Sequence, residues 1–444
     1  MVLATVDWSR GLTEMTLAFH ILFATVGVGI PVFISLAEWM GIRKKDAHYS
    51  LMARRWARGF VITVAVGVVT GTCIGLQLSL LWPEFMRLAG NVIGLPLFME
   101  TFAFFFEAIF LGIYLYTWNR FSNPYIHWLL TLPILIGSSG SALFITTVNA
   151  FMNTPQGFTL ENGRLTHIDP LAAMFNPAAP SKVAHVLSSA YLTAAFLLAM
   201  IAAFAMLRGR MDDYYRKSIR LNMTAGLLLA ALTIGIGDMS ARFLAQEQPE
   251  KLAAAEWHFD TGSRAPLLIG GRVDPETQEV TGALKIPWAL SLLATHRSDG
   301  VVAGLNEFPK DEWPPLYVHY LFDAMVVIGF YLLAVPVLFV ALLRLKRRHA
   351  YNRWMLAAIL AGGPLSLLAI ELGWFYAEVG RQPWILRGYM RVSDAATTNP
   401  HVSVTFWLFA GLYAVLGIVC LFVLVRLFRN KPAELELQTR RIIL

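Results

Sequence analysis

The chain has 444 residues, of which 57% are hydrophobic and only 15% are charged, and its mean hydropathy is +0.56. This composition lies outside the range of soluble globular proteins and predicts a protein that crosses a membrane several times. The net charge of +7 at pH 7 fits attraction to anionic lipid better than binding to nucleic acid, so we expect a lipid membrane and no nucleic acid among its partners.

Nine segments are long and apolar enough to cross a bilayer, because about 20 helical residues span its hydrocarbon core. In chain order they are residues 15–38, 59–82, 95–117, 128–150, 183–207, 221–243, 316–343, 354–378 and 402–425. We therefore predict an all-α integral membrane protein whose nine transmembrane helices form bundles. The first segment is too long for a cleaved signal peptide and its start carries Asp7 and Glu14, so we expect it to be a retained span.

Lysine and arginine are distributed unevenly between the connections, and short connections rich in them stay in the cytoplasm. Most of the 36 basic residues lie in alternate connections, namely Arg43 to Arg58, Arg120, Arg208 to Arg220, Arg344 to Arg353 and the C-terminal tail. The N-terminus is then outside and the C-terminus is in the cytoplasm. The chain divides into helices one to six (1–244), an extracytoplasmic loop (245–315), helices seven to nine (316–430) and a cytoplasmic tail (431–444).

A few chemically active side chains fall in the predicted spans, and the orientation places nearly all of them in the outer half of the membrane. They are His20, Glu100, Glu107, His185, Met325, Glu378 and Arg381. We expect His20 about two turns inside the first span and Glu100 near the outer end of the third, with Glu107 on nearly the same face about 10 Å further along. The inner half is comparatively bare.

These side chains also have ordinary structural interpretations. A single histidine near a helix end is an interfacial hydrogen-bonding group about as often as it is a functional residue. A methionine usually fills core space. A carboxylate inside a span is harder to explain in this way, because its charge is costly there. Histidine, methionine and carboxylate are all iron ligands. A His/Met pair suits a low-spin haem, and a single histidine or carboxylate leaves one iron position open for a small gas.

Several motifs together resemble the large, quinol-oxidising subunit of cytochrome bd oxidases, and the resemblance covers all nine predicted spans. The motifs are SRGLTEMTLAFH with Arg10 and His20, METFAFFFEAIFLG with Glu100 and Glu107, GSSGSALF with Ser141, SKVAHV with His185, EKLAAAEW, LKIPWALSLLATH, Met325 and GWFYAEVGRQPW. The combination of GRQPW after a glutamate with KLAAAE in the outer loop is the most specific. The compact loop resembles the short-loop branch of the family.

The resemblance implies three haems. His185 and Met325 would be the axial ligands of a low-spin haem b that receives electrons from quinol. His20 and Glu378 would each bind one high-spin haem, one of type b and one of type d, in an order that the sequence leaves open. Other implied positions are Glu100 beside the oxygen-reducing centre, Arg10 and Arg381 at haem propionates, and Trp374 between the cofactors.

The loop at 245–315 contains the segment PEKLAAAEW, whose spacing brings Lys251 and Glu256 near one another on a short helix. Without the resemblance, an ordinary surface ion pair is the favoured interpretation. With it, both become candidates for quinol binding. Glu256 would accept a proton and Lys251 would be a hydrogen-bonding or charged partner.

Position then suggests how charge could separate across the membrane. Quinol oxidised at the outer face would release its protons outside, whereas oxygen reduction would take protons from the cytoplasm, so no pump would be needed. The candidates for a proton route through the inner half are Glu107, Ser138, Ser139 and Ser141. Glu371, one heptad before Glu378, fits such a route and a pairing with a neighbouring helix equally well.

The resemblance further implies a heterodimer with a second nine-helix subunit, small single-helix accessory subunits, and a multi-pass location in the bacterial cytoplasmic (inner) membrane. Two other classes of protein compete with this interpretation. A secondary transporter would also contain buried carboxylates but usually shows internal repeats, and we detect none. A haem–copper oxidase needs a histidine cluster that includes an adjacent pair, and the sequence has no His-His dipeptide.

The remaining polar residues receive minor roles. His319 and Asp323 are candidates to support the low-spin haem from beside Met325. Asp238 and Arg242, one turn apart, are expected to form an ion pair. No role is assigned to the other histidines, which are His48, His127, His167, His258, His296, His349 and His401.

Overall fold

The computed structural model describes residues 2–345, 349–429 and 433–439. Within these residues, nine helical stretches are long and apolar enough to cross a membrane. They are α1 (Val2–Lys44), α2 (Ala47–Leu81), α3 (Pro83–Tyr116), α4 with α5 (Pro124–Leu129, Thr131–Asn153), α7 (Ala179–Leu207), α8 (Asp213–Glu247), α11 (Val318–Leu345), α12 (Arg353–Val379) and α14 (Val402–Arg429). The prediction of nine spans in a mainly helical protein is confirmed. The basic residues Lys346, Arg347 and Arg348 and the tail's 440–444, which we assigned to the cytoplasmic side, lie outside the described residues.

Several helices extend well beyond the predicted spans. The first helix begins at Val2 rather than at residue 15, and α3 begins at Pro83 rather than at residue 95. An apolar window detects only the hydrocarbon core, whereas the helical hydrogen bonds continue through polar turns such as that of Glu84 and Arg87. Positions along the helices therefore differ from positions along the predicted spans, whereas the depths in the membrane stay predictions. His20 lies about five turns from the start of α1, and Glu100 lies near the middle of α3.

Helix starts follow local capping chemistry. The side chain of Asp46 accepts a hydrogen bond from the backbone of His48 at the start of α2, and Asn352 accepts one from Met355 at the start of α12. Asn123 does the same for α4, which has Pro124 in its first turn. These side chains bind the free backbone N–H groups of a first turn, so the short connections between spans end where the caps lie.

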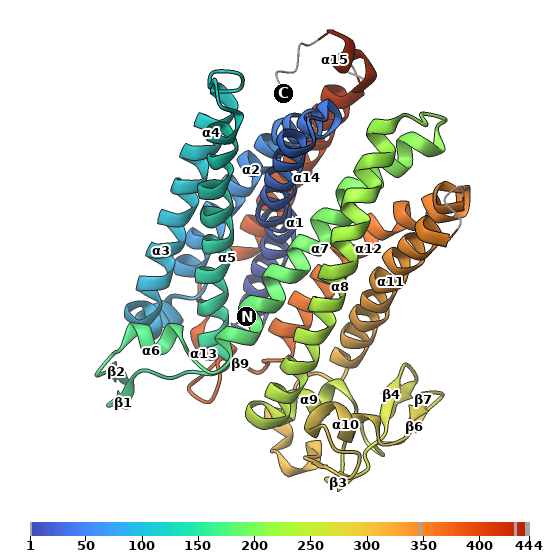
Figure 1. The fold of residues 1–444 in the computed structure, drawn as a ribbon. Coiled ribbons are helices and arrows are strands. Elements are labelled where there is room, and N and C mark those ends of the chain that lie inside the picture. Colours follow the sequence, from blue (N-terminus) through green and yellow to red (C-terminus); the bar gives the residue numbers. More distant parts are fainter. Residues whose placement is uncertain (1, 346–348, 430–432, 440–444) are drawn as a thin grey trace.

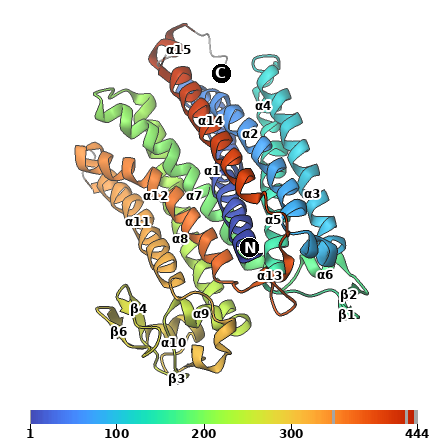
Figure 2. The same ribbon diagram turned by 180° about the vertical axis from the view of Figure 1, so that it is seen from behind.

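The spans form two groups that meet along α1, α5 and α7 (Figure 1). In the first group α1 packs on α2, α5 and α14, and α3 packs on α5. In the second group the neighbours are α7 with α8, α8 with α11, α11 with α12, and α12 with α7, so α7 and α11 stand at opposite corners of a four-helix bundle. The same two groups are seen from behind in Figure 2.

Burial differs strongly between the spans. In the most apolar window of α7, 61% of the residues are buried inside the chain, whereas the corresponding value for α14 is 11%. The largest core cluster joins α7 residues such as Phe196 and Met206 to Phe33 and Phe60 of the first group and Phe339 of the second. Packing against α7 therefore holds the two groups together.

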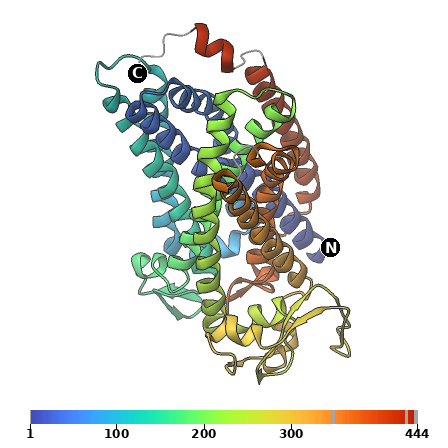
Figure 3. The same cartoon turned by 45° about the vertical axis from the view of Figure 1, so that its right-hand side comes forward.

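The long polar connection between α8 and α11 is a small folded unit at one end of the helices (Figure 3). It contains α9 (Pro249–Ala255), α10 (Ala289–Thr295) and the short helices η1 (Leu305–Glu307) and η2 (Lys310–Glu312). Its antiparallel strand pairs are β3 (Gly262–Ser263) with β8 (Val301–Val302), β4 (Leu267–Ile269) with β7 (Leu284–Ile286), and β5 (Arg272–Val273) with β6 (Val280–Thr281). Between β4 and β5, Gly271 has a φ of +94°, and a Cβ there would lie 2.8 Å from Ala283. This kink requires glycine.

Smaller elements complete both ends of the molecule. The same end of the molecule as the small folded unit also carries the hairpin β1 (Thr159–Glu161) and β2 (Arg164–Thr166), α6 (Pro170–Met174), β9 (Trp384–Leu386) with β10 (Met390–Arg391), and α13 (Val392–Ala395). The opposite end carries η3 (His349–Tyr351) and α15 (Ala433–Thr439). There Glu436 accepts hydrogen bonds from Arg55 (2.7 Å) and Arg58 (2.6 Å), which attach α15 to α2.

Candidate functional site

His185 and Met325 face the interior of the four-helix bundle from opposite corners, α7 and α11. Each lies against a glycine of another helix. A Cβ added to Gly237 of α8 would lie 3.7 Å from His185 Cε1, and one added to Gly373 of α12 would lie 3.1 Å from Met325 Sδ. Glycines at these two positions leave room beside both side chains.

The imidazole of His185 has no compensating partner. Its Nδ1 is buried and makes no hydrogen bond with any residue that the structure describes. A buried polar atom of this kind is costly unless a ligand or water satisfies it. Together with the thioether of Met325 and the two glycines, this arrangement fits a flat group with axial positions for a nitrogen and a sulfur ligand.

His20 faces α2, where its Nδ1 lies 2.9 Å from Thr70 Oγ1. The next residue of α2 is Gly71, and a Cβ there would lie 3.1 Å from His20 Cε1. As for His185 and Met325, a glycine of the neighbouring helix borders the side chain. Among the described residues, the hydrogen bond of normal geometry is the one at Nδ1, and the Gly67 carbonyl also lies near the ring.

Glu378, at the end of α12, accepts hydrogen bonds from two side chains. One of them, Arg381, was expected to lie in the site, and the other, Asn149, was not. Arg381 Nη2 donates to Glu378 Oε2 at 2.6 Å, and Asn149 of α5 donates to Glu378 Oε1. Asn149 in turn accepts a hydrogen bond from Lys182 Nζ of α7 (2.9 Å). Arg381 Nη1 is buried without a partner in the described chain, so this guanidinium can still bind a carboxylate such as a haem propionate.

Arg10 and Trp374 are the other residues expected around the haems. Neither contacts the hydrogen-bonded group of Glu378, Arg381 and Asn149 through a hydrogen bond between described residues. Arg10 lies in α1, partly buried, and makes no ion pair with another described residue. Trp374 lies one turn before Glu378 on α12 and is half-buried.

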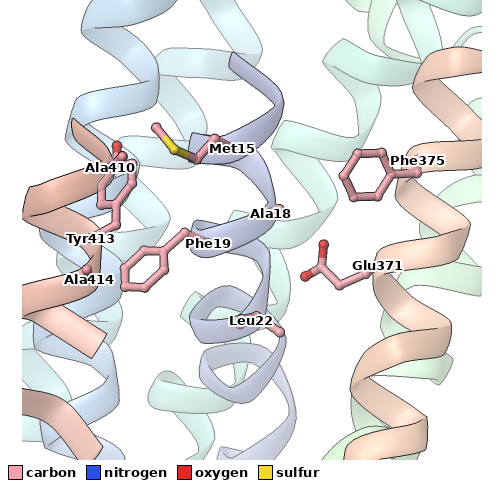
Figure 4. A pocket seen from close by; sticks show the side chains of 9 residues that line it. All are labelled: Met15, Ala18, Phe19, Leu22, Glu371, Phe375, Ala410, Tyr413 and Ala414. Carbon is pink, nitrogen blue, oxygen red and sulfur yellow. The ribbon is translucent and has the colours of Figure 1, made fainter. Parts of the chain in front are cut away.

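An apolar cavity of about 480 Å³ lies between α1, α12 and α14. Met15, Phe19 and Leu22 line it from α1, and Phe375 and Tyr413 line it from the other two helices. Figure 4 shows the carboxylate of Glu371 pointing into this space from α12. Both Glu371 oxygens are buried without a hydrogen-bond partner in the described residues, so the alternative of a pairing with a neighbouring helix is not supported. The lining is largely apolar, with Glu371 as its acidic group.

Two of the carboxylates on α3 lie in different environments. Ser141 of α5, which the sequence analysis grouped with Glu107, donates instead to Glu100 Oε1 at 2.9 Å. Glu107 is 4% exposed, and its Oε1 has no partner in the described part of the chain. Ser138 donates to its own helix at Leu135 O, and Ser139 bonds Tyr191 of α7 (2.8 Å). The structure thus brings Glu100 and Ser141 together but connects neither Ser138 nor Ser139 to Glu107.

Lys251 and Glu256 are buried, with only 3% and 1% of their surface exposed. The interpretation as a surface ion pair was therefore wrong. The aliphatic part of the Lys251 side chain packs against Gly380, and its Nζ donates a hydrogen bond to Ala377 O (2.9 Å). The carboxyl of Glu256 has no side-chain or backbone hydrogen bond in the described chain that meets normal geometry. Both lie at the inner side of the small folded unit, against the ends of α11 and α12.

Burial sets the protonation of this pair. It lowers the pKa of Lys251 to about 7, and the neighbouring Arg381 acts in the same direction. It raises the pKa of Glu256 well above the usual value, with a further contribution from the Asp323 carboxylate. Desolvation disfavours the charged form in both cases. The two groups act separately, because the charges that shift the pKa of Lys251 include Arg381 and Glu378 and the charge that shifts that of Glu256 is Asp323. Each buried group can exchange a proton or a hydrogen bond with an uncharged ligand.

His319 and Asp323 bind the small folded unit rather than another part of the bundle. His319 Nδ1 donates to Ala255 O (2.7 Å), its Nε2 lies 3.1 Å from Asp323 Oδ2, and Trp257 stacks on the ring. Gly270 N donates to Asp323 (2.6 Å). The predicted ion pair of Asp238 and Arg242 is confirmed at 3.4 Å, and His296 joins it at 2.9 Å.

Sequence reasoning missed a second polar cluster. His127, to which no role was assigned, is buried, with its Nδ1 2.6 Å from Glu38 Oε1, and Tyr114 donates to Glu38 Oε2 (2.6 Å). It also missed Asn149, Lys182 and Thr70. Only pairing across more than 30 positions reveals these contacts, so no local motif could have indicated them.

The side chains therefore fit the groups that the resemblance implies. His185 has an unpartnered buried nitrogen, and glycines border His20, His185 and Met325. Glu378 differs, since both of its oxygens accept hydrogen bonds, but an unpartnered guanidinium nitrogen of Arg381 lies beside it. These are the features that haem iron, the porphyrin plane and its propionates require.

Comparison with known proteins gives one consistent family. The family model described as cytochrome bd terminal oxidase subunit I matches residues 8–432. The chain is 43% identical over 435 residues to the Bacillus subtilis (strain 168) protein named as cytochrome bd menaquinol oxidase subunit I, covering 97% of this chain and 98% of that protein. It is 32% identical over 444 residues to cytochrome bd ubiquinol oxidase subunit 1 of the same organism, covering 96% and 93%. The solved bd oxidase of Geobacillus thermodenitrificans has a TM-score of 0.92 at 58% identity and covers 96% of this chain and 99% of its own.

Proposed function

The chain belongs to the family of cytochrome bd terminal oxidase subunit I, and from this premise we propose that it binds three haems and oxidises quinol at its outer end to reduce oxygen to water. Quinol oxidase chemistry is common to the relatives it matches. The observation that carries the proposal is the placement of His185 and Met325 at opposite corners of one bundle, each bordered by a glycine.

Haems bound at these positions would supply the one-electron carriers between quinol and oxygen. His185 and Met325 would hold the low-spin haem b. His20 and Glu378 would hold the two high-spin haems, of types b and d. Arg381, through its free Nη1, and Arg10 would bind propionates. Trp374, near the end of α12, would lie between the haems. Glu100, which accepts a hydrogen bond from Ser141, would lie beside the oxygen-reducing centre.

The small folded unit at 245–315 would bind quinol. Lys251, with its pKa near 7, would offer a hydrogen bond to a quinol oxygen. Glu256 would be protonated at rest because its pKa is raised. After releasing this proton on the outer side, its carboxylate would be a strong base and would accept the next proton from quinol.

Charge separation without a pump would depend on the side of proton uptake. Glu107 lies on the same face of α3 as Glu100 and about 10 Å further from the small folded unit. Its buried, unpartnered oxygen suits a group that holds a proton in transit toward Glu100. Protons for oxygen reduction would then come from the cytoplasm, while those of quinol leave outside.

In the working enzyme, this chain would form a heterodimer with a second membrane subunit, to which small accessory subunits would bind. The complex would lie in the bacterial cytoplasmic membrane. The large apolar side chains exposed along α3 and α14 support this assembly. Examples are Phe98, Phe102 and Ile109 on α3 and Trp407 and Phe422 on α14. Contact with lipid and with a second subunit would cover them.

The experiment that tests the proposal is optical spectroscopy of the purified oxidase complex after substitution of the low-spin ligands. We expect His185→Ala and Met325→Ala each to remove the low-spin haem signal and quinol-driven oxygen uptake together, while high-spin haem remains. His401→Ala, which changes an exposed histidine just before α14, is the control. Retention of both the low-spin signal and quinol activity in either variant would refute the ligand assignment.

A further inference from the structure

The contact between His20 and Thr70 joins α1 to α2 at a buried point. Thr70 is fully buried (0% exposed), and its Oγ1 lies 2.9 Å from His20 Nδ1. The residues are 50 positions apart, so the contact depends on the packing of α1 against α2 and not on any local motif.

The direction of this hydrogen bond follows from the other partners of Thr70. Its Oγ1 also lies 2.9 Å from Val66 O and 3.1 Å from Gly67 O in the preceding turn of α2. Carbonyl oxygens only accept, and the hydroxyl has a single proton, which it donates to this turn. The hydroxyl oxygen is then an acceptor for His20, so His20 carries its proton on Nδ1.

A neutral imidazole with its proton on Nδ1 has a free electron pair on Nε2. The Gly67 carbonyl, which also accepts from Thr70, is a second polar neighbour of the ring. No hydrogen bond of normal geometry is formed at Nε2 by the residues that the structure describes. Gly71 allows the ring to lie close to α2, because a Cβ there would approach His20 Cε1 to 3.1 Å. One side of the ring is thus fixed by α2, and the other side is free to bind a metal.

We propose that Thr70 is a positioning residue that holds His20 in the tautomer and ring orientation required for iron binding through Nε2. The proposal rests on the proposed function, which makes His20 a haem ligand. Histidines that bind metals usually donate their second N–H to a neighbouring acceptor, which fixes the tautomer and makes the ligand more basic. Here the acceptor is a threonine hydroxyl of the adjacent helix.

The test uses the whole oxidase complex with Thr70→Val, which keeps the shape of the side chain and removes the acceptor, and Thr70→Ser, which keeps the hydroxyl. Two quantities are measured: the iron–histidine stretching band in the resonance Raman spectrum of the reduced protein, and the rate of haem transfer to apomyoglobin. For Thr70→Val we expect the band at a lower wavenumber and an affinity for this haem about 10–100-fold weaker. Thr70→Ser should remain close to wild type.

The matched control is Thr63→Val on the same helix. Thr63 is also buried (9% exposed), and its hydroxyl donates only to Phe60 O, at 2.8 Å, among the described residues. This variant should leave the stretching band and haem transfer unchanged. The low-spin haem, measured in the same samples, reports an intact fold. If Thr70→Val lacks it, Thr70→Ala, which removes the same acceptor, is read in its place.

The outcomes separate the proposal from its premise. If His20→Ala loses one high-spin haem while Thr70→Val matches the wild type in both measurements, the positioning role of Thr70 is wrong and the ligand role of His20 stands. If His20→Ala retains all three haems, the ligand role itself fails. A lowered stretching band in both Thr70→Val and Thr63→Val would also overturn the proposal, since the effect would then come from α2 in general.

Discussion

Glu256 is the residue whose environment differs most from that of an ordinary carboxyl outside the membrane spans. It is 1% exposed, and neither of its oxygens has a hydrogen-bond partner among the described residues. The folded protein therefore holds the proton of Glu256 more tightly than the unfolded chain, whose carboxyl has the usual pKa of 4.5. The protonated form contributes stability that is complete below this value and is lost as the pH rises toward the raised pKa.

We predict that Glu256→Gln removes this pH dependence. Relative to wild type, its thermal denaturation midpoint should increase steadily as the pH rises from about 5 to about 8, because one ionising group changes the free energy of unfolding by up to about 1.4 kcal/mol per pH unit. Differential scanning fluorimetry in detergent measures both proteins. Glu276→Gln, which changes an exposed carboxyl of the same unit, should parallel the wild type. A constant difference between Glu256→Gln and wild type at all pH values would contradict the prediction.

At this scale the sequence indicates residue types and not their partners. Glu378 and Arg381 are three positions apart, so their ion pair could be expected from helix geometry. The contact of Glu378 with Asn149 joins residues 229 positions apart, and no periodicity predicts it. The positions of Gly237 and Gly373 beside His185 and Met325 could not be predicted either, because a glycine in an apolar span has many ordinary explanations until its neighbour is known.

Among the elements, the start of α11 has a mechanical connection to the small folded unit. His319 donates to Ala255 O at the end of α9, and Asp323 accepts from Gly270 N in the turn after β4. Trp257 stacks on His319 with ring centres 3.8 Å apart. Two turns of one helix thus fix two separate parts of the unit, next to Glu256.

We predict that His319→Phe loosens this unit. Phenylalanine can keep the stacking on Trp257 but cannot make the hydrogen bonds, so backbone amides at 255–271 should exchange faster with deuterium. The KM for quinol should rise, while the low-spin haem spectrum should change little. Hydrogen exchange with mass spectrometry in nanodiscs measures the first effect, and His401→Phe, at an exposed outer turn, is the control. Unchanged exchange at 255–271 would show that the stacking alone holds the unit.

The sequence predicts the long elements well and the connections poorly. Nine apolar stretches produce nine spans because the bilayer sets their length. The ends of α1 and α3 were misplaced because the helices continue into polar turns. The segment at 245–315 was expected to be a loop, since its two- and three-residue strands are too short to produce an alternating pattern.

The two ends of the molecule differ in their chemistry. The small folded unit, Lys251 and Glu256 lie at one end, together with the N-terminus (Figure 1). The opposite end carries the basic connections after α1 and α7 and the contact of Arg55 and Arg58 with α15. Such an asymmetry of basic residues guides orientation during membrane insertion, and it predicts that the small folded unit lies on the outer side.

We therefore predict that the end with the small folded unit faces outward, and single cysteines can test this. Glu276→Cys lies in the exposed turn between β5 and β6, and Met211→Cys lies in the turn between α7 and α8, where Met211 is 46% exposed. In intact right-side-out cells or spheroplasts, a membrane-impermeant maleimide should label Glu276→Cys at once and Met211→Cys only after permeabilisation. The native Cys73 and Cys420 lie within spans, so the unsubstituted protein supplies the background. Labelling in the reverse order would place quinol oxidation on the cytoplasmic side. Protons released from quinol and protons consumed with oxygen would then share one side, and the separation of charge proposed for this oxidase would not occur.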